Sequence, residues 1–194
     1  MEDNLGDWRI DAVVTLASHL TSAYPGGPSF TPGDHAYICC GGQVNNRGIV
    51  NFIAPSPVAL ALNTSWNAAL SAERLKEQIA WQSTPSPDGL VPSVTQEALT
   101  TLYDFFEQAM ISVFFAYQSL EAFANDKIVG SGGGKIEIQR RDKNLSFDRR
   151  EAERSLSTSE KLGDVVPKII GIESPKGIAV WQRFRELEQA RDEV

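Results

Sequence analysis

Residues 93–128 read SVTQEALTTLYDFFEQAMISVFFAYQSLEAFANDKI and form the longest periodic stretch of the chain. Their apolar positions fall into two series, each repeating every seven residues: Leu99, Phe106, Val113 and Leu120, then Leu102, Ala109, Ala116 and Phe123. Such paired series are typical of the seam of a helix that packs against other helices. Large apolar residues also lie on the neighbouring faces, so we predict that this helix is the central one of a bundle.

The rest of the C-terminal half is also predicted to be helical. The run from Gly130 to Lys135 is glycine-rich and indicates a flexible loop. Ser157 and Glu160 have the spacing of a capping box, so a short helix should follow and turn at Pro167. A loop is expected over 171–177, and a last helix from about Ala179 to the end.

The N-terminal 92 residues predict a smaller α+β lobe. Apolar residues in 8–20 have helical spacing. Two strand-like runs, 36–41 and 48–54, flank an Asn- and Gly-containing turn and predict a β-hairpin over about 36–54. A helix is expected over about 66–81, and a proline-rich linker at 83–92 divides the chain. The predicted fold is therefore mainly α, with domains 1–92 and 93–194.

The net charge and the N-terminal residues indicate where the protein acts and what it is not expected to bind. The formal net charge is −7, which argues against tight, non-specific binding to a phosphate backbone. The first ten residues include Glu2, Asp3 and Asp7, the wrong charge for a signal peptide. The most apolar stretch, 109–124, is too short to cross a bilayer. We expect a cytoplasmic protein with no membrane association.

Cofactor and metal sites are not expected. Cys39 and Cys40 are adjacent, a spacing that rarely allows a disulfide, so they are predicted to be reduced. Two cysteines with only two histidines make a poor zinc site. The Gly134–Lys135 pair echoes a phosphate loop, but the spacing is one residue short and Ile136 follows where Ser or Thr is needed.

The last helix carries a charge inside its apolar stripe. With Trp181 at zero, Arg191 falls at about 280°, between Phe184 at about 300° and Leu187 at about 240°. Either the guanidinium reaches water near the helix end, or it meets a partner or a cleft.

Glu121 and Asn125 lie one turn apart on the long helix and are the proposed partners of Arg191. Such a cluster is either a structural ion pair or a site where Arg191 contacts a phosphate, and both interpretations stay open.

A basic stretch offers a second candidate contact for nucleic acid. Residues 135–150 include Arg140, Arg141 and Lys143, without regular aromatic interleaving. The stretch is either a solvated loop or an RNA-binding segment.

The C-terminal half resembles HEPN-like proteins over about residues 95–194. The residues that carry the resemblance are 106–125 on the long helix, 159–162, Trp181, Phe184, Leu187 and 191–194. The resemblance implies an antiparallel helical bundle that forms a homodimer. Many members are metal-independent ribonucleases of toxin–antitoxin or phage-defence systems.

The family's motif is an Arg, four to six residues, then a His on the final helix. Arg191 matches the Arg and Asp192 the polar residue that often follows, whereas the His would have to come after Val194. In such an enzyme the RNA 2′-hydroxyl attacks its own phosphate, and Arg191 stabilises the charge while Glu121 and Asn125 orient it. The expectation is an RNA endonuclease when the motif is complete. The alternative is a non-catalytic module that binds a protein partner or a nucleotide.

Overall fold

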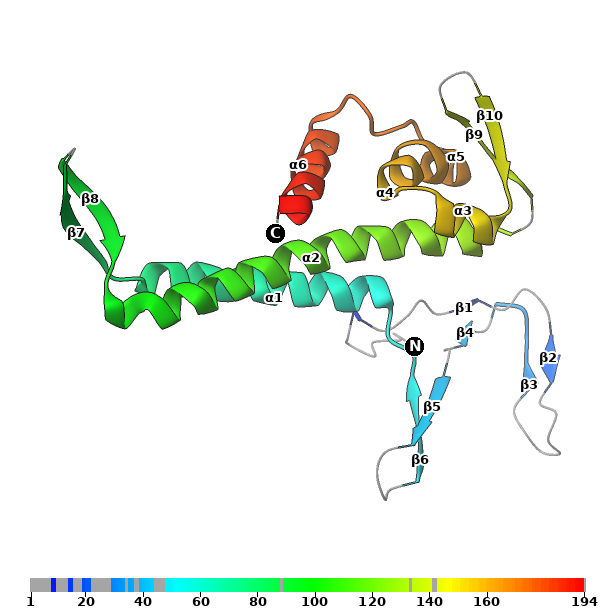
Figure 1. Cartoon of the computed structure of the whole chain (residues 1–194). Coiled ribbons are helices and arrows are strands. Elements are labelled where there is room, and N and C mark those ends of the chain that lie inside the picture. Colours follow the sequence, from blue (N-terminus) through cyan, green and yellow to red (C-terminus); the bar gives the residue numbers. More distant parts are fainter. Residues whose placement is uncertain are drawn as a thin grey trace. The chain divides into compact units, whose positions relative to one another are not determined.

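The computed structural model describes residues 8–9, 14–15, 19–21, 29–33, 35–36, 39–43, 48–87, 89–132, 134–140 and 143–193 (Figure 1). The protein is mainly α-helical, with small two-stranded sheets. The chain divides into two compact units, Met1–Leu60 and Ala61–Val194. The predicted boundary lay after residue 92, so the second unit also takes in residues 61–92.

Short antiparallel strand pairs make up the described part of the first unit. They are β1 (Val14–Thr15) with β4 (His35–Ala36), β2 (Leu20–Thr21) with β3 (Ser29–Phe30), and β5 (Cys39–Gln43) with β6 (Ile49–Ile53). The last pair confirms the predicted hairpin, with Cys39 opposite Ile53.

The helix predicted over 8–20 is wrong where the structure describes it. Residues 8–9 form a turn, whereas 14–15 and 20 belong to strands. Consecutive β-branched residues at Val13, Val14 and Thr15 favour extended backbone and outweigh the helical spacing. Residue 19 is described and belongs to no helix or strand, and the remaining residues of this prediction lie outside the described ones.

Helix α1 (Pro57–Gln78) begins earlier than the predicted residue 66. The hydroxyl oxygen of Ser56 accepts a hydrogen bond from the backbone N–H of Ala59 at 3.3 Å, as a helix cap does. Pro57 follows at the first helical position, where its fixed φ suits a helix start. Strand β6 therefore ends just before Pro55 and Pro57, and Pro57 is also the first residue of α1.

Strands β7 (Trp81–Ser86) and β8 (Gly89–Val94) replace the predicted linker at 83–92. Pro85 lies opposite Leu90, and Pro92 opposite Ser83. In a two-stranded ribbon both strands are edges, so each proline can face away from its partner without breaking a hydrogen bond of the ladder. The proline content that suggested a loop is therefore compatible with a hairpin.

Helix α2 (Leu99–Gly130), preceded by the 3₁₀ turn η2 (Gln96–Ala98), confirms the predicted long helix to within a few residues. The hydroxyl of Ser65 on α1 donates to the backbone carbonyl of Ser112 on α2 at 2.9 Å. The described residues contain no helix with the length and apolar content needed to span a membrane.

Seven further elements follow α2. They are β9 (Ile136–Arg140), β10 (Lys143–Phe147), α3 (Arg149–Ser155), α4 (Thr158–Glu160), the π-helical η3 (Lys161–Val165), α5 (Val166–Ile170) and α6 (Ala179–Glu193). Helices α3 to α6 lie along one side of α2 (Figure 1). The capping box of Ser157 with Glu160 and the start of the last helix at Ala179 are confirmed.

Residues 135–150, interpreted from the sequence as either a solvated loop or an RNA-binding segment, contain β9, β10 and the start of α3 where the structure describes them. Ile136 and Ile138 are buried while Glu137 between them is exposed, the alternation of a half-buried strand. Asp148 caps α3 by accepting from the N–H of Glu151 at 2.8 Å. The alternation of apolar and polar residues and the capping Asp148 are both visible in the sequence.

The main apolar core gathers at the C-terminal end of α2. It consists of Ala124, Ile128, Ile136, Ile138, Ala152, Leu156, Val165 and Val166. Toward the N-terminal end of α2, Phe106 and Phe114 remain 49% and 43% exposed. Phe106 is thus the exposed member of the two heptad series, whereas the other members are half-buried.

Replacing Ile128 with Ala should lower the free energy of unfolding by about 2–5 kcal/mol, because the side chain is fully buried and the change leaves a cavity. Val129→Ala on the same helix is the matched control. That side chain is 49% exposed, so its effect should stay within about 0.5 kcal/mol. Urea unfolding measures both, and equal losses in the two variants would contradict this placement of the core.

Candidate functional site

One aromatic ring on α2 contacts three residues of the last helix. The ring of Tyr117 stacks on Phe184 with centroids 6.3 Å apart, and the Cζ atom of Arg191 lies 3.9 Å from its centroid. Its hydroxyl donates to Oε1 of Glu188 at 3.4 Å. Residues 184, 188 and 191 lie on the same face of α6, each about one helical turn from the next. Tyr117 is itself buried, so it fixes this face of α6 against α2.

Arg191 is partly shielded and has a carboxylate partner. Its side chain is 29% exposed, and its Nε donates to Oδ1 of Asp192 at 2.9 Å. The hydrogen bond with Asp192 is the main reason that the pKa of Arg191 is raised above its ordinary value, against a smaller lowering by burial. The sequence correctly indicated a charge within the apolar stripe, and the structure supplies an aromatic face and the adjacent carboxylate as its companions.

Glu121 and Asn125, the predicted companions of Arg191, have other surroundings. Oε1 of Glu121 lies 3.8 Å from Nζ of Lys161. The side-chain oxygen of Asn125 is buried without a hydrogen-bond partner. In the part of the chain that the structure describes, neither residue bonds to Arg191. The predicted cluster is therefore not assembled, because Tyr117 lies between α2 and the end of α6 and Lys161 attracts Glu121.

Lys161 is a buried cation that the sequence did not single out. It begins the π-helical segment η3 and is only 1% exposed. Burial lowers its pKa, while the charges of Glu121 and Glu153 partly offset the shift. Nothing in its sequence surroundings signals burial, because lysine is almost always exposed.

A polar network between α4 and α6 adjoins Tyr117 through Glu188. The hydroxyl of Ser159 lies 2.8 Å from Oε1 of Glu188, and Arg185 forms an ion pair with Glu188. Arg185 also lies 3.0 Å from the Ser159 hydroxyl. The i, i+3 spacing of Arg185 and Glu188 was the signal available in the sequence. This network holds α6 to the α4 segment.

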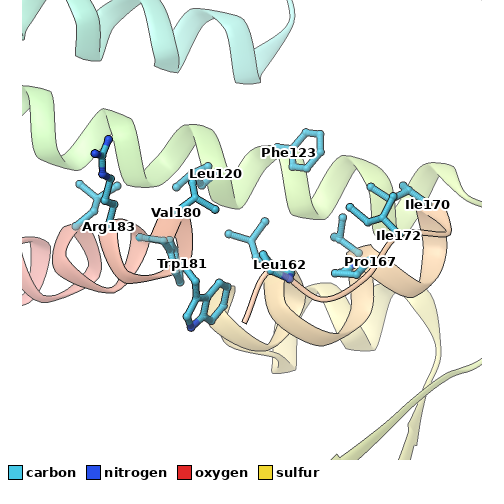
Figure 2. Close-up of a pocket in the computed structure, with 13 residues that line it drawn as sticks. Leu120, Phe123, Leu162, Pro167, Ile170, Ile172, Val180, Trp181 and Arg183 are labelled. Atoms are coloured by element: carbon cyan, nitrogen blue, oxygen red, sulfur yellow. The ribbon is translucent and has the colours of Figure 1, made fainter. Parts of the chain in front are cut away.

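An apolar cavity of about 430 Å³ opens beside Phe184 (Figure 2). Its walls come from Leu120 and Phe123 on α2, Leu162 on η3, Pro167 on α5 and Ile172 in the loop before α6. Arg183 is the one charged residue among those that line it. The cavity has the size and character of a small-molecule or side-chain pocket.

Gly163 allows the loop before α6 to approach the η3 segment closely. A Cβ atom at this position would clash with Cε of Lys176 and would lie 3.0 Å from the ring of Trp181. The Ser174 hydroxyl donates to the Gly163 carbonyl at 2.6 Å, and Lys176 pairs with Asp164 at 2.6 Å. These contacts fix one wall of the cavity.

The predicted nucleic-acid contacts are only partly available. Arg140 donates to both carboxylate oxygens of Glu160, at 2.5 and 2.7 Å. This hydrogen bonding is the largest cause that lowers the pKa of Glu160 to about 2. Lys143 faces Arg140 across the hairpin and is exposed, and Arg141 lies outside the described residues.

The chain matches no protein-family model, no curated protein and no solved structure. Within the described ranges, no group of three or more His, Cys, Asp or Glu side chains is placed to hold a metal ion. Helix α6 contains no histidine. The guanidinium of Arg191 can donate hydrogen bonds to an anionic oxygen, and the carboxylates of Glu188 and Asp192 are the ionisable groups of α6 next to it.

Glu160→Gln should remove a pH-dependent part of the stability. The pKa of Glu160 is about 2 in the folded state against an ordinary 4.5, so its ionised form stabilises the fold above about pH 4.5. This contribution is lost as the pH falls toward about 2. Gln keeps the capping geometry but cannot form the ion pair. The melting temperature of the variant should therefore lie below that of the wild type at neutral pH, and the gap should close in acid.

Glu151→Gln, an exposed carboxylate on α3, serves as the control for this titration. It should show no comparable gap at any pH. A wild-type advantage over Glu160→Gln that stays constant from neutral pH to about pH 2 would contradict the role of the Arg140 pair.

Proposed function

We propose that the chain is the helical module of an HEPN-like, metal-independent RNA endonuclease of a bacterial defence or toxin–antitoxin system. The observation that carries the proposal is the guanidinium of Arg191, held 3.9 Å from the Tyr117 ring where the last helix meets the long one. This is the residue that matches the Arg of the family motif. An Arg held in this way presents a fixed cation to a phosphate.

Asp192 is the present partner of Arg191 and would give way to a phosphate. Its side chain is 62% exposed, and an exposed ion pair contributes only about 0–1 kcal/mol. A phosphate can accept two parallel hydrogen bonds from the guanidinium, which is a stronger arrangement. Tyr117 would keep the guanidinium in place during this exchange, because the ring contact does not involve the hydrogen-bonding edge.

In the proposed reaction the 2′-hydroxyl of RNA attacks the adjacent phosphorus. The bond from phosphorus to the 5′-oxygen breaks, which leaves a cyclic phosphate and a 5′-hydroxyl end. Arg191 stabilises the negative charge that builds up on the phosphate oxygens. The proton is moved by the motif histidine that would follow Val194. The orienting role expected of Glu121 and Asn125 passes to Tyr117, since neither of them bonds to Arg191 in the described structure.

A second candidate is a non-catalytic HEPN-like module that binds a protein partner or a nucleotide. The observation that favours it is that both contacts of Arg191, with Tyr117 and Asp192, lie within the chain. In this candidate Arg191 only attaches α6 to α2, and the ligand binds elsewhere.

A chain that carries the complete motif should cleave RNA in the presence of a chelator, and Arg191→Ala should lower the rate by about 10²–10³-fold because the charge on the phosphate is no longer stabilised. Arg191→Lys should also lose most of the rate, since lysine lacks the two-pronged hydrogen bonding of a guanidinium. Gel analysis of an end-labelled RNA measures the rates.

Arg154→Ala is the matched control, because this arginine is exposed on α3. It should cleave at the wild-type rate. Equal rates for the wild type and Arg191→Ala would remove Arg191 from the mechanism. No cleavage by the wild type, together with a stability that survives Arg191→Lys but not Arg191→Ala, would favour the non-catalytic module instead.

A further inference from the structure

A second pocket adjoins the apolar core and has no residue of α6 in its lining. It has a volume of about 210 Å³ and is formed by the start of β9, the first residue of α3 and helix α5. Three cationic residues line it: Lys135, Arg149 and Lys168. Its apolar walls include Ile136 and Val165, both buried. Positive charge thus converges beside a surface of low dielectric, where electrostatic interactions are stronger than in water.

Arg149 is the central residue of this pocket and lacks a counter-ion. Its Nε is buried without a hydrogen-bond partner, and its guanidinium donates only a long bond, 3.4 Å, to the backbone carbonyl of Ile128. No carboxylate of the described residues lies within ion-pair distance of it. A guanidinium stays charged at every accessible pH. A half-buried one without a partner therefore favours the binding of an anion.

The two lysines of the pocket are also free of carboxylates. Nζ of Lys168 lies 3.5 Å from the backbone carbonyl of Glu137, which carries no charge. The Glu137 side chain points to the exposed face of β9, between two buried isoleucines. Lys135 forms no ion pair with any residue that the structure describes.

Glu137 is the one carboxylate among the residues that line the pocket. Asp148, which precedes Arg149, accepts a hydrogen bond from the backbone N–H of Glu151 and forms no ion pair with Arg149. The described lining of the pocket therefore carries more positive than negative charge, although the whole chain has a net charge of −7.

We propose that this pocket binds a phosphate monoester. A dianionic phosphoryl group presents three oxygens, which suits donors that approach from Arg149, Lys135 and Lys168 on three different elements. The group could be the phosphate of a free nucleotide or the 5′-phosphate end of an RNA. Only the second source rests on the proposed RNA-directed function.

Isothermal titration calorimetry with AMP and with adenosine tests the assignment on the full chain. AMP should bind, and adenosine should bind at least about tenfold more weakly, because only AMP carries the phosphate. Arg149→Gln and Lys168→Gln should each weaken AMP binding by about tenfold or more. Lys168 is exposed, so its variant keeps the test valid if Arg149→Gln fails to fold.

Arg154→Gln, exposed on the same helix as Arg149, is the matched control and should bind AMP as the wild type does. Equal binding of AMP and adenosine, or unchanged AMP binding by Lys168→Gln, would overturn the proposal. A 5′-phosphorylated oligoribonucleotide that binds more tightly than its 5′-hydroxyl twin identifies the RNA end as the source, and equal binding of the two identifies the nucleotide. The readout is AMP binding and not RNA cleavage, so this proposal and the proposed endonuclease fail separately.

Discussion

The contact of the Tyr117 ring with α6 is the interaction on which the account of Arg191 depends. The ring stacks on Phe184, faces the guanidinium of Arg191 and donates its hydroxyl hydrogen to Glu188. Each contact is modest, about 0.5–1.5 kcal/mol for an aromatic pair and about 0.5–1 kcal/mol for an exposed cation over a ring. Because all three converge on one buried side chain, they set the rotation of α6 on α2. That rotation decides whether Arg191 faces the ring or the solvent.

The sequence predicted the helices far better than it predicted the contacts between them. Heptad spacing located α2, and the Ser157 capping box located the turn into α4. Periodicity also placed Arg191 among apolar residues, but it describes one helix at a time and contains nothing about the register of its neighbour. Glu121 was therefore predicted to pair with Arg191, although its carboxylate lies within ion-pair distance of the buried Lys161 from a distant segment. The two missed hairpins were hidden by prolines and by a basic run that resembled loops.

Charge pairing explains which cations remain available for a ligand. Glu160 pairs with Arg140, and Glu121 lies within ion-pair distance of the buried Lys161. The pairing of half-buried Arg191 is weaker, because its partner Asp192 is exposed and easily exchanged. Half-buried Arg149 has no carboxylate partner among the described residues, and its buried Nε has no hydrogen-bond partner. The two proposals for this protein therefore concern two half-buried arginines that can still bind an anion.

A double-mutant cycle between Tyr117 and Arg191 tests most directly whether the ring holds the guanidinium. Tyr117→Leu, Arg191→Met and the double variant would be compared with the wild type by urea unfolding. The account predicts a favourable coupling free energy of about 1 kcal/mol between the two side chains. Losses that add to within about 0.3 kcal/mol would contradict it, and Arg191 would then be a surface residue that the ring does not position.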